Sequence, residues 1–98
     1  MLEDTTALQV EYRNLTEERL PAQATAAWPV QADHCFQRLV LDVLFEDVWY
    51  DHVADRPAVE SLTADQLREA IGIAESLLDD PERTAELNRR SLRYRDEL

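Results

Sequence analysis

Apolar residues recur at helical spacing from the start of the chain. Leu8, Tyr12 and Leu15 follow an i, i+4, i+7 pattern within residues 4–20. The alternation of apolar and polar residues over positions 8–12 is also compatible with a strand, but the remaining sequence offers such a strand no partner. We therefore expect a first helix over residues 4–20, ending before Pro21 because proline removes a backbone donor.

Residues 33–53 predict a central helix, with Asp33 at its N-cap or in its first turn. Its apolar positions cover most of the helix circumference: Phe36, Leu39, Val40, Leu41, Val43, Leu44, Phe45 and Val48. A helix of this kind is usually a buried central element. Its end stays open in the sequence, since it either breaks near Trp49 and Tyr50 or stops before Pro57.

Capping signals place the last two helices. Thr63 and Gln66 have the spacing of a capping box, and a regular apolar stripe begins at Leu67. Asp80 and Pro81 suit the N-cap and N1 positions of a final helix. The sequence thus predicts an all-α fold, a bundle of about four helices around a buried central helix, with residues 1–98 forming one domain.

Composition supports the same fold. The chain has 98 residues, the size of one domain, and 45% of them are hydrophobic, which is typical of a globular protein. It contains one glycine, so few positions suit the tight turns that join strands in sheets.

The charge is strongly acidic. Ten basic residues, all arginine, stand against 21 acidic ones and give a net charge of −11. Such a field repels phosphates, so we expect no nucleic-acid binding and no attraction to an anionic membrane. No apolar run is long enough to span a bilayer and no secretory signal is recognisable, so we expect a cytoplasmic protein. The absence of lysine fits either a GC-rich genome or adaptation to high salt.

Histidine and cysteine are few. His34, Cys35 and His52 are competent metal ligands, but in one continuous helix His34 and His52 lie about 27 Å apart at 1.5 Å per residue. Cys35 and His34 are adjacent and point in different directions from a helix, which disfavours a catalytic pair. We therefore expect no metal site and packing roles for these side chains.

Four polar residues at i, i+4 spacing form a ladder on the central helix: His34, Arg38, Asp42 and Glu46. Arg38 and Asp42 are spaced to pair with each other. One interpretation is an ion-pair network between helices, or simply a solvated face. The other is a polar pocket against the last helix, where Arg89, Arg90 or Arg93 meets Asp42 or Glu46. The aromatic residues Trp28, Phe45, Trp49 and Tyr50 are likewise either core or a partner-binding patch.

The chain from about residue 28 to residue 95 resembles a group of short prokaryotic proteins often identified as GCN5-related N-acetyltransferases. The resemblance is carried by Trp28-Pro29-Val30-Gln31, Asp33-His34-Cys35-Phe36-Gln37-Arg38, Asp42, Phe45 to His52, Arg56-Pro57, Leu62-Thr63, Gln66-Leu67, Ala70, Ile71 and Leu87-Asn88-Arg89-Arg90-Ser91-Leu92. It implies acetyl transfer from acetyl-CoA. A site shared with that family would involve Asp33, His34, Cys35, Arg38 and Asp42.

The residues themselves favour a different function. A Gly-rich turn that binds the pyrophosphate of CoA needs several glycines, and the single one here, Gly72, lies within a predicted helix. We therefore expect no cofactor and a small non-catalytic helical protein that acts through protein–protein interaction, with a protein partner or as a homodimer. The alternative is an N-acetyltransferase-like enzyme, or an enzyme subunit, that uses the polar ladder.

Overall fold

Four helices dominate the part of the chain that the computed structural model describes, residues 5–26, 28, 30–53 and 58–95. The first is made of α1 (Thr6–Arg13), a π-helical segment (Asn14–Arg19) and α2 (Leu20–Gln23). The others are α3 (Asp33–Phe45), α4 (Ala64–Asp79) and α5 (Glu82–Tyr94), with 3₁₀ turns at Trp49–Asp51 and Ala58–Ser61. These residues contain no strand, so the all-α prediction is confirmed.

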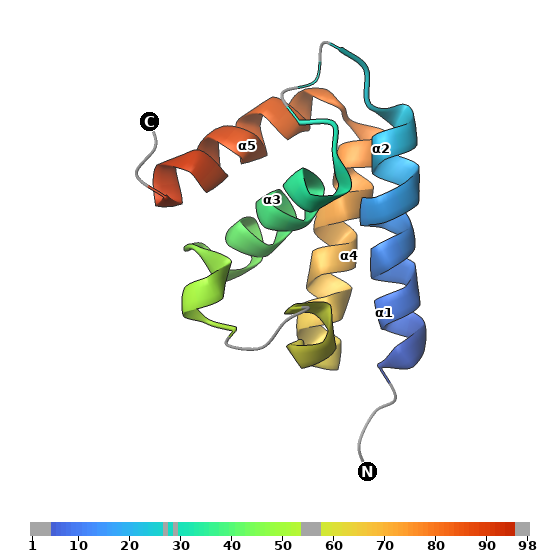
Figure 1. Ribbon diagram of the computed structural model, residues 1–98, viewed down its shortest axis with the longest axis vertical. Coiled ribbons are helices and arrows are strands. Elements are labelled where there is room, and N and C mark those ends of the chain that lie inside the picture. Colours follow the sequence, from blue (N-terminus) through green and yellow to red (C-terminus); the bar gives the residue numbers. More distant parts are fainter. Residues whose placement is uncertain (1–4, 27, 29, 54–57, 96–98) are drawn as a thin grey trace.

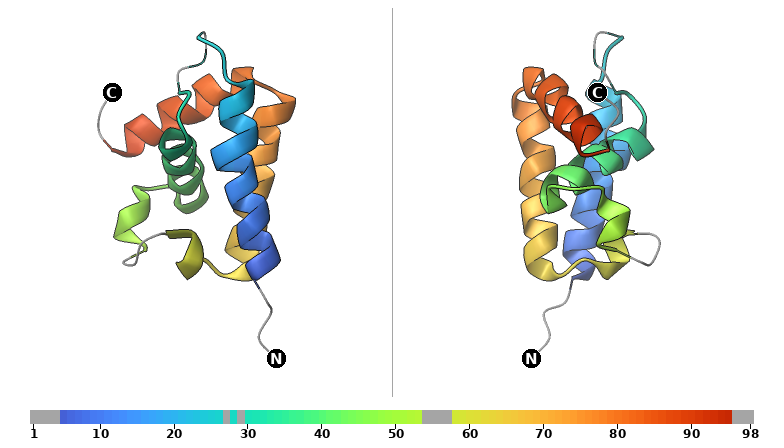
Figure 2. Two further views of the ribbon diagram at one scale, coloured as in Figure 1. Left: turned by 45° about the vertical axis from the view of Figure 1, so that its right-hand side comes forward. Right: turned by 90° about the vertical axis from the view of Figure 1, so that its left-hand side faces the viewer.

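The helices pack around α3. The first helix lies alongside α4, whereas α5 starts at the C-terminal end of α4 and extends across α3 (Figures 1 and 2). α3 packs against α4, α5, α2 and the π-helical segment. Its residues Phe36, Leu39 and Val40 are fully buried, so the predicted central position of this helix is confirmed.

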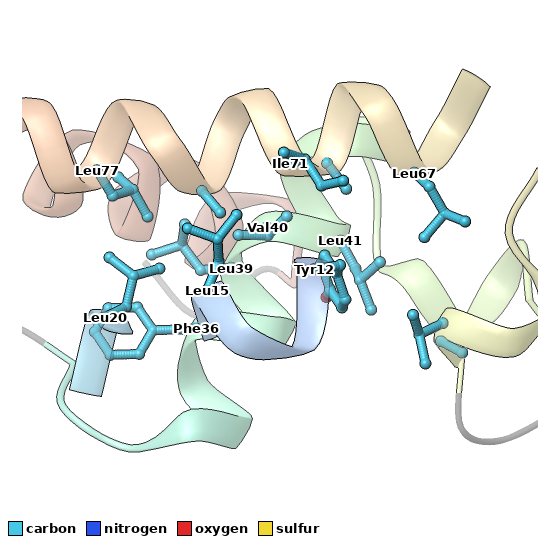
Figure 3. Packing of buried hydrophobic residues seen from close by; sticks show 14 of the residues in the cluster. Tyr12, Leu15, Leu20, Phe36, Leu39, Val40, Leu41, Leu67, Ile71 and Leu77 are labelled. Atoms are coloured by element: carbon cyan, nitrogen blue, oxygen red, sulfur yellow. The ribbon is translucent and has the colours of Figure 1, made fainter. Parts of the chain in front are cut away.

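The core lies between the first helix, α3 and α4. Figure 3 shows Leu77 and Ile71 of α4 facing side chains of the other two helices. Leu15 and Leu20 come from the first helix and are at most 1% exposed. Burying a leucine side chain stabilises the fold by about 1.5–3 kcal/mol, so this contact supplies much of the stability of so short a chain.

The first helix extends further than predicted. It continues through Pro21 to Gln23 instead of ending before the proline. The proline ring crowds the carbonyl group four residues earlier, and the wider turns of the π-helical segment lie immediately before it. In this stretch the hydroxyl of Thr16 donates to the carbonyl oxygen of Tyr12 at 3.1 Å, which gives a buried backbone group a partner.

The central helix is shorter than predicted. It ends at Phe45, and Glu46 takes a left-handed conformation with φ of 54°. The chain then folds back so that the backbone N–H of Trp49 donates to Asp42 Oδ1 at 3.0 Å. The helix thus ends without glycine or proline, and a hydrogen bond to a buried carboxylate seven residues earlier holds the chain that follows.

The two capping signals have different outcomes. Thr63 Oγ1 accepts from the N–H of Gln66, and Gln66 Oε1 accepts from the N–H of Thr63, so the capping box is confirmed. The last helix begins one residue later than expected, with Pro81 before its first turn. The side chain of Asp80 still accepts from the N–H of Glu82 at 3.2 Å.

The aromatic residues take intermediate positions. Trp28, Phe45 and Trp49 are partly buried against the core, whereas Tyr50 is 47% exposed. Among the described residues, Val10 and Tyr50 are the large hydrophobic side chains that stand exposed. None of the helices in this part of the chain has the length and apolar character needed to cross a membrane.

Candidate functional site

A cavity of about 600 Å³ opens between the first helix, α3 and the two 3₁₀ turns. It is lined by Tyr12, Arg13, Glu17, His34, Gln37, Arg38, Leu41, Trp49, Tyr50, Ala58, Val59 and Arg95. The lining combines an apolar and aromatic wall with three arginines. This volume lies within the range of small-ligand sites.

Asp42 is buried beside this cavity and is saturated with hydrogen bonds. Its Oδ2 accepts from Ser91 Oγ at 2.6 Å and from Arg95 Nε at 2.7 Å. Its Oδ1 accepts from the N–H of Trp49 at 3.0 Å and from Arg95 Nη2 at 3.3 Å. The side chain of Asp42 is 0% exposed, so these donors replace water around the charge.

Arg95 joins the buried carboxylate to the cavity. Its side chain is 17% exposed, and its guanidinium also lies 5.4 Å from the centroid of the Tyr50 ring, within cation–π range. The pocket interpretation placed Arg89, Arg90 or Arg93 against Asp42 or Glu46, but the arginine that meets Asp42 in the structure is Arg95. Arg95 directly follows α5, and its contact with Tyr50 joins this end of the helix to the chain after α3.

Arg38 does not pair with Asp42, although their spacing allows it. Its Nη2 donates instead to Asn88 Oδ1 of α5, and its Nε is buried with no hydrogen-bond partner in the described structure. Arg13, across the cavity on α1, likewise has no carboxylate within 4.0 Å among the described residues. Arg13 and Arg38 therefore line the cavity without forming an ion pair with any described residue.

Tyr12 contributes a second unpaired polar group. Its side chain is 1% exposed, and its hydroxyl has no hydrogen-bond partner in the part of the chain described. Burial, with a smaller contribution from the charge of Glu17, raises the pKa of Tyr12 well above its ordinary value of about 10. The hydroxyl is therefore a protonated donor at neutral pH. Tyr12 lies two residues before the π-helical segment, a kind of distortion that is frequent at functional sites.

The structure separates the other candidate residues. His34 lines the cavity from the start of α3, but its side chain is 81% exposed and lies 3.6 Å from Asp33 Oδ1. Cys35 is partly buried against the core and is not part of the cavity lining. Glu46 leaves the polar ladder because it follows the end of the helix.

His52 belongs to the loop after α3. Its ring stacks on Phe45 with a centroid distance of 5.0 Å, and its Nε2 lies 3.3 Å from Asp47 Oδ2. Since α3 ends at Phe45, our premise of one continuous helix through both histidines was wrong. In the described ranges, no group of three or more His, Cys, Asp or Glu side chains is placed to hold a metal ion.

Sequence reasoning singled out His34 and Arg38 of the cavity but missed Tyr12 and Arg13. Tyr12 was assigned to the apolar face of the first helix, where a tyrosine is a core residue, and Arg13 was not considered. No sequence pattern around these two consecutive positions distinguishes a cavity wall. Arg95 was noticed within the arginine cluster, although its contact with Asp42 depends on how α5 crosses α3.

Comparison with models of protein families, with curated proteins and with solved structures found no match. The resemblance to acetyltransferases therefore stays a hypothesis.

Proposed function

We propose that this chain is a small non-catalytic binding protein whose cavity recognises an anionic group carried by its partner. The observation that carries the proposal is that Arg13 and Arg38 form no ion pair with a described residue. Both line the cavity, and neither has a carboxylate within 4.0 Å among the described residues. This occurs in a chain with 21 acidic residues and 10 arginines, where carboxylates are abundant.

The buried donors strengthen the case. Leaving a buried hydrogen-bonding group without a partner costs about 1–3 kcal/mol, and more when the group is charged. Arg38 Nε and the Tyr12 hydroxyl are both in this condition, and both belong to residues that line the cavity. Both atoms have almost no accessible surface, so an anion in the cavity reaches them only when neighbouring side chains move. The charge-assisted hydrogen bonds that it would then accept are the stronger kind.

The arrangement of the candidate catalytic residues supports binding over catalysis. Asp42 accepts from Ser91, Arg95 and Trp49, so acting as a base would require it to break these contacts. A nucleophile needs a base within hydrogen-bond reach. Cys35, the thiol suggested by the acetyltransferase resemblance, is absent from the cavity lining.

Tryptophan fluorescence offers a direct test, since Trp49 lines the cavity. In a Trp28→Phe variant it is the one remaining tryptophan. We expect at least one anion from a panel of acetate, phosphate, benzoate and succinate to give a saturable change at constant ionic strength. The change should be lost in an Arg13→Gln/Arg38→Gln variant and retained in Arg68→Gln, whose arginine pairs with Asp65 on α4.

Two results would contradict the proposal. One is that no anion of the panel gives a saturable change. The other is transfer of the acetyl group when the chain is incubated with acetyl-CoA and a primary amine, followed by mass spectrometry. Acetyl transfer would establish the enzyme alternative instead, and we expect none.

A further inference from the structure

We infer that the anionic group is a single carboxylate attached to a flat aromatic body. The inference rests on the proposed function and specifies the class of ligand that the cavity takes. This chemistry has two sources, a free aryl acid and a polypeptide that ends in an aromatic residue. Three independent features of the cavity lead to it: the charge of its lining, its two unpaired donors and its aromatic wall.

The charge of the lining matches one negative charge. Three arginines and one carboxylate, that of Glu17, line the cavity, and one of the arginines, Arg95, pairs with Asp42 outside the lining. One positive charge is left for the ligand. The rest of the chain carries a large negative charge, and its repulsion grows with the charge of the incoming anion. A carboxylate therefore fits better than a phosphate dianion or a polyphosphate.

The unpaired donors match a carboxylate in number. Arg38 Nε and the Tyr12 hydroxyl each lack a partner in the described structure, and a carboxylate has two oxygens that accept such bonds. The hydroxyl of Tyr12 is protonated at neutral pH, as in any tyrosine, and burial raises its pKa further. Arg13 adds a second guanidinium to the same lining. Binding would thus satisfy groups that the described chain leaves unsatisfied, which is where specificity against uncharged analogues arises.

The aromatic wall matches the body of the ligand. Trp49 and Tyr50 meet edge to face, with ring centroids 5.9 Å apart, and both line the cavity. Leu41, Ala58 and Val59 add apolar surface. A cavity of about 600 Å³ is much larger than a carboxylate alone, so the charge occupies a small part of it. A flat apolar group fills the remainder and stacks favourably on aromatic side chains.

Isothermal titration of the full chain with 3-phenylpropionate tests the inference. Three analogues separate its parts: 3-phenylpropanamide removes the charge, propionate removes the ring, and phenyl phosphate carries a second negative charge. We expect saturable binding of 3-phenylpropionate and at least about tenfold weaker binding of the amide and of propionate, since losing a charge-assisted contact or an aromatic contact costs roughly 1.4 kcal/mol or more. Phenyl phosphate should also bind at least about tenfold more weakly, because the acidic chain repels its second negative charge.

Variants assign the binding to the cavity. Arg38→Gln should weaken 3-phenylpropionate binding by tenfold or more, whereas Arg68→Gln on α4 should not change it. Arg13→Gln provides a second test should Arg38→Gln fail to fold, because the Arg13 side chain is only partly buried. The peptides Gly-Gly-Phe with a free and with an amidated C-terminus distinguish the source. Tighter binding of the free peptide than of 3-phenylpropionate indicates a chain end, and the reverse indicates a free acid.

The outcomes separate the inference from the proposed function. Equal binding of the amide, or of propionate, overturns the inference about the carboxylate or the ring. Tighter binding of phenyl phosphate that depends on Arg38 also overturns it but leaves an anion-binding function in place. Absence of binding by every anion, in the titration and in the fluorescence panel, removes both.

Discussion

Asp42 and Arg95, 53 residues apart in the chain, form a double hydrogen bond in the interior of the protein. The Oδ2–Nε distance is 2.7 Å and the Oδ1–Nη2 distance is 3.3 Å. The pair joins α3 to the residue that follows α5, and Trp49 attaches the intervening loop to the same carboxylate. The buried carboxylate of Asp42 thereby fixes α3, the loop after it and the end of α5 relative to one another.

Asp42→Asn should reduce the free energy of unfolding by about 3–5 kcal/mol, because removing one partner of a buried pair leaves the other charge uncompensated. The urea midpoint measures the effect. Asp65→Asn is the matched control, since Asp65 is 97% exposed and its pair with Arg68 is a surface pair worth at most about 1 kcal/mol. Equal effects of the two substitutions would show that the Asp42 network has no special role in stability.

Tyr12 should make the fold sensitive to alkaline pH. Because its pKa is raised in the folded state, its stabilising contribution is complete below the unfolded pKa of about 10 and is lost as the pH rises above it. The expected loss is up to about 1.4 kcal/mol per pH unit. Tyr12→Phe should remove this slope in urea denaturation between pH 9 and pH 11.

The Tyr50→Phe variant serves as the control, because Tyr50 is half exposed. It should keep the pH slope of the original chain. At pH 7, Tyr12→Phe should leave stability unchanged or raise it, since the hydroxyl has no partner in the described structure to lose. A clear loss at neutral pH would show that the hydroxyl has a partner in solution.

Thr63→Ala should destabilise the protein by about 0.5–2 kcal/mol through loss of the N-cap of α4. Thr63→Ser keeps the hydroxyl and should restore most of that stability. Urea denaturation of the three proteins measures both effects. Identical midpoints for the alanine and serine variants would mean that the hydrogen bond from Gln66 contributes nothing.

Glu46→Gly should stabilise the protein by up to about 1 kcal/mol, because glycine adopts a φ of 54° without the steric cost that a side chain incurs. It also removes a negative charge from the C-terminal end of α3, where the helix dipole disfavours it. Glu46→Ala separates the causes, since it removes the charge and keeps Cβ. Thermal unfolding should rank glycine above alanine; the reverse order would contradict the argument from backbone strain.

The sequence predicted those features of the helices that depend on residues close together in the chain. The capping box at Thr63 and the apolar circumference of α3 depend on residues a few positions apart, and both were confirmed. The end of α3 was not predictable in this way. Glu46 carries no sequence signal for a left-handed conformation, and the loop is held by the hydrogen bond from Trp49 to Asp42, which forms only in the folded chain.

The cavity was predictable only in part. The i, i+4 spacing marked His34 and Arg38, since both lie on one face of one helix. Tyr12 and Arg13 come from a different helix, and their approach to Arg38 depends on how α1 packs against the rest of the bundle. The choice of Arg95 among the C-terminal arginines depends in the same way on the crossing of α5 over α3.

The Nε–Hε group of Arg38 gives the most direct test of the anion-binding cavity, because it is the buried charged donor without a partner in the described structure. Its signal can be followed by ¹H–¹⁵N NMR during addition of 3-phenylpropionate, with the Nε–Hε signal of Arg68 as the reference. The proposal predicts a saturable shift and slower hydrogen exchange at Arg38, and no change at Arg68. An unchanged Arg38 signal at saturating ligand would contradict it.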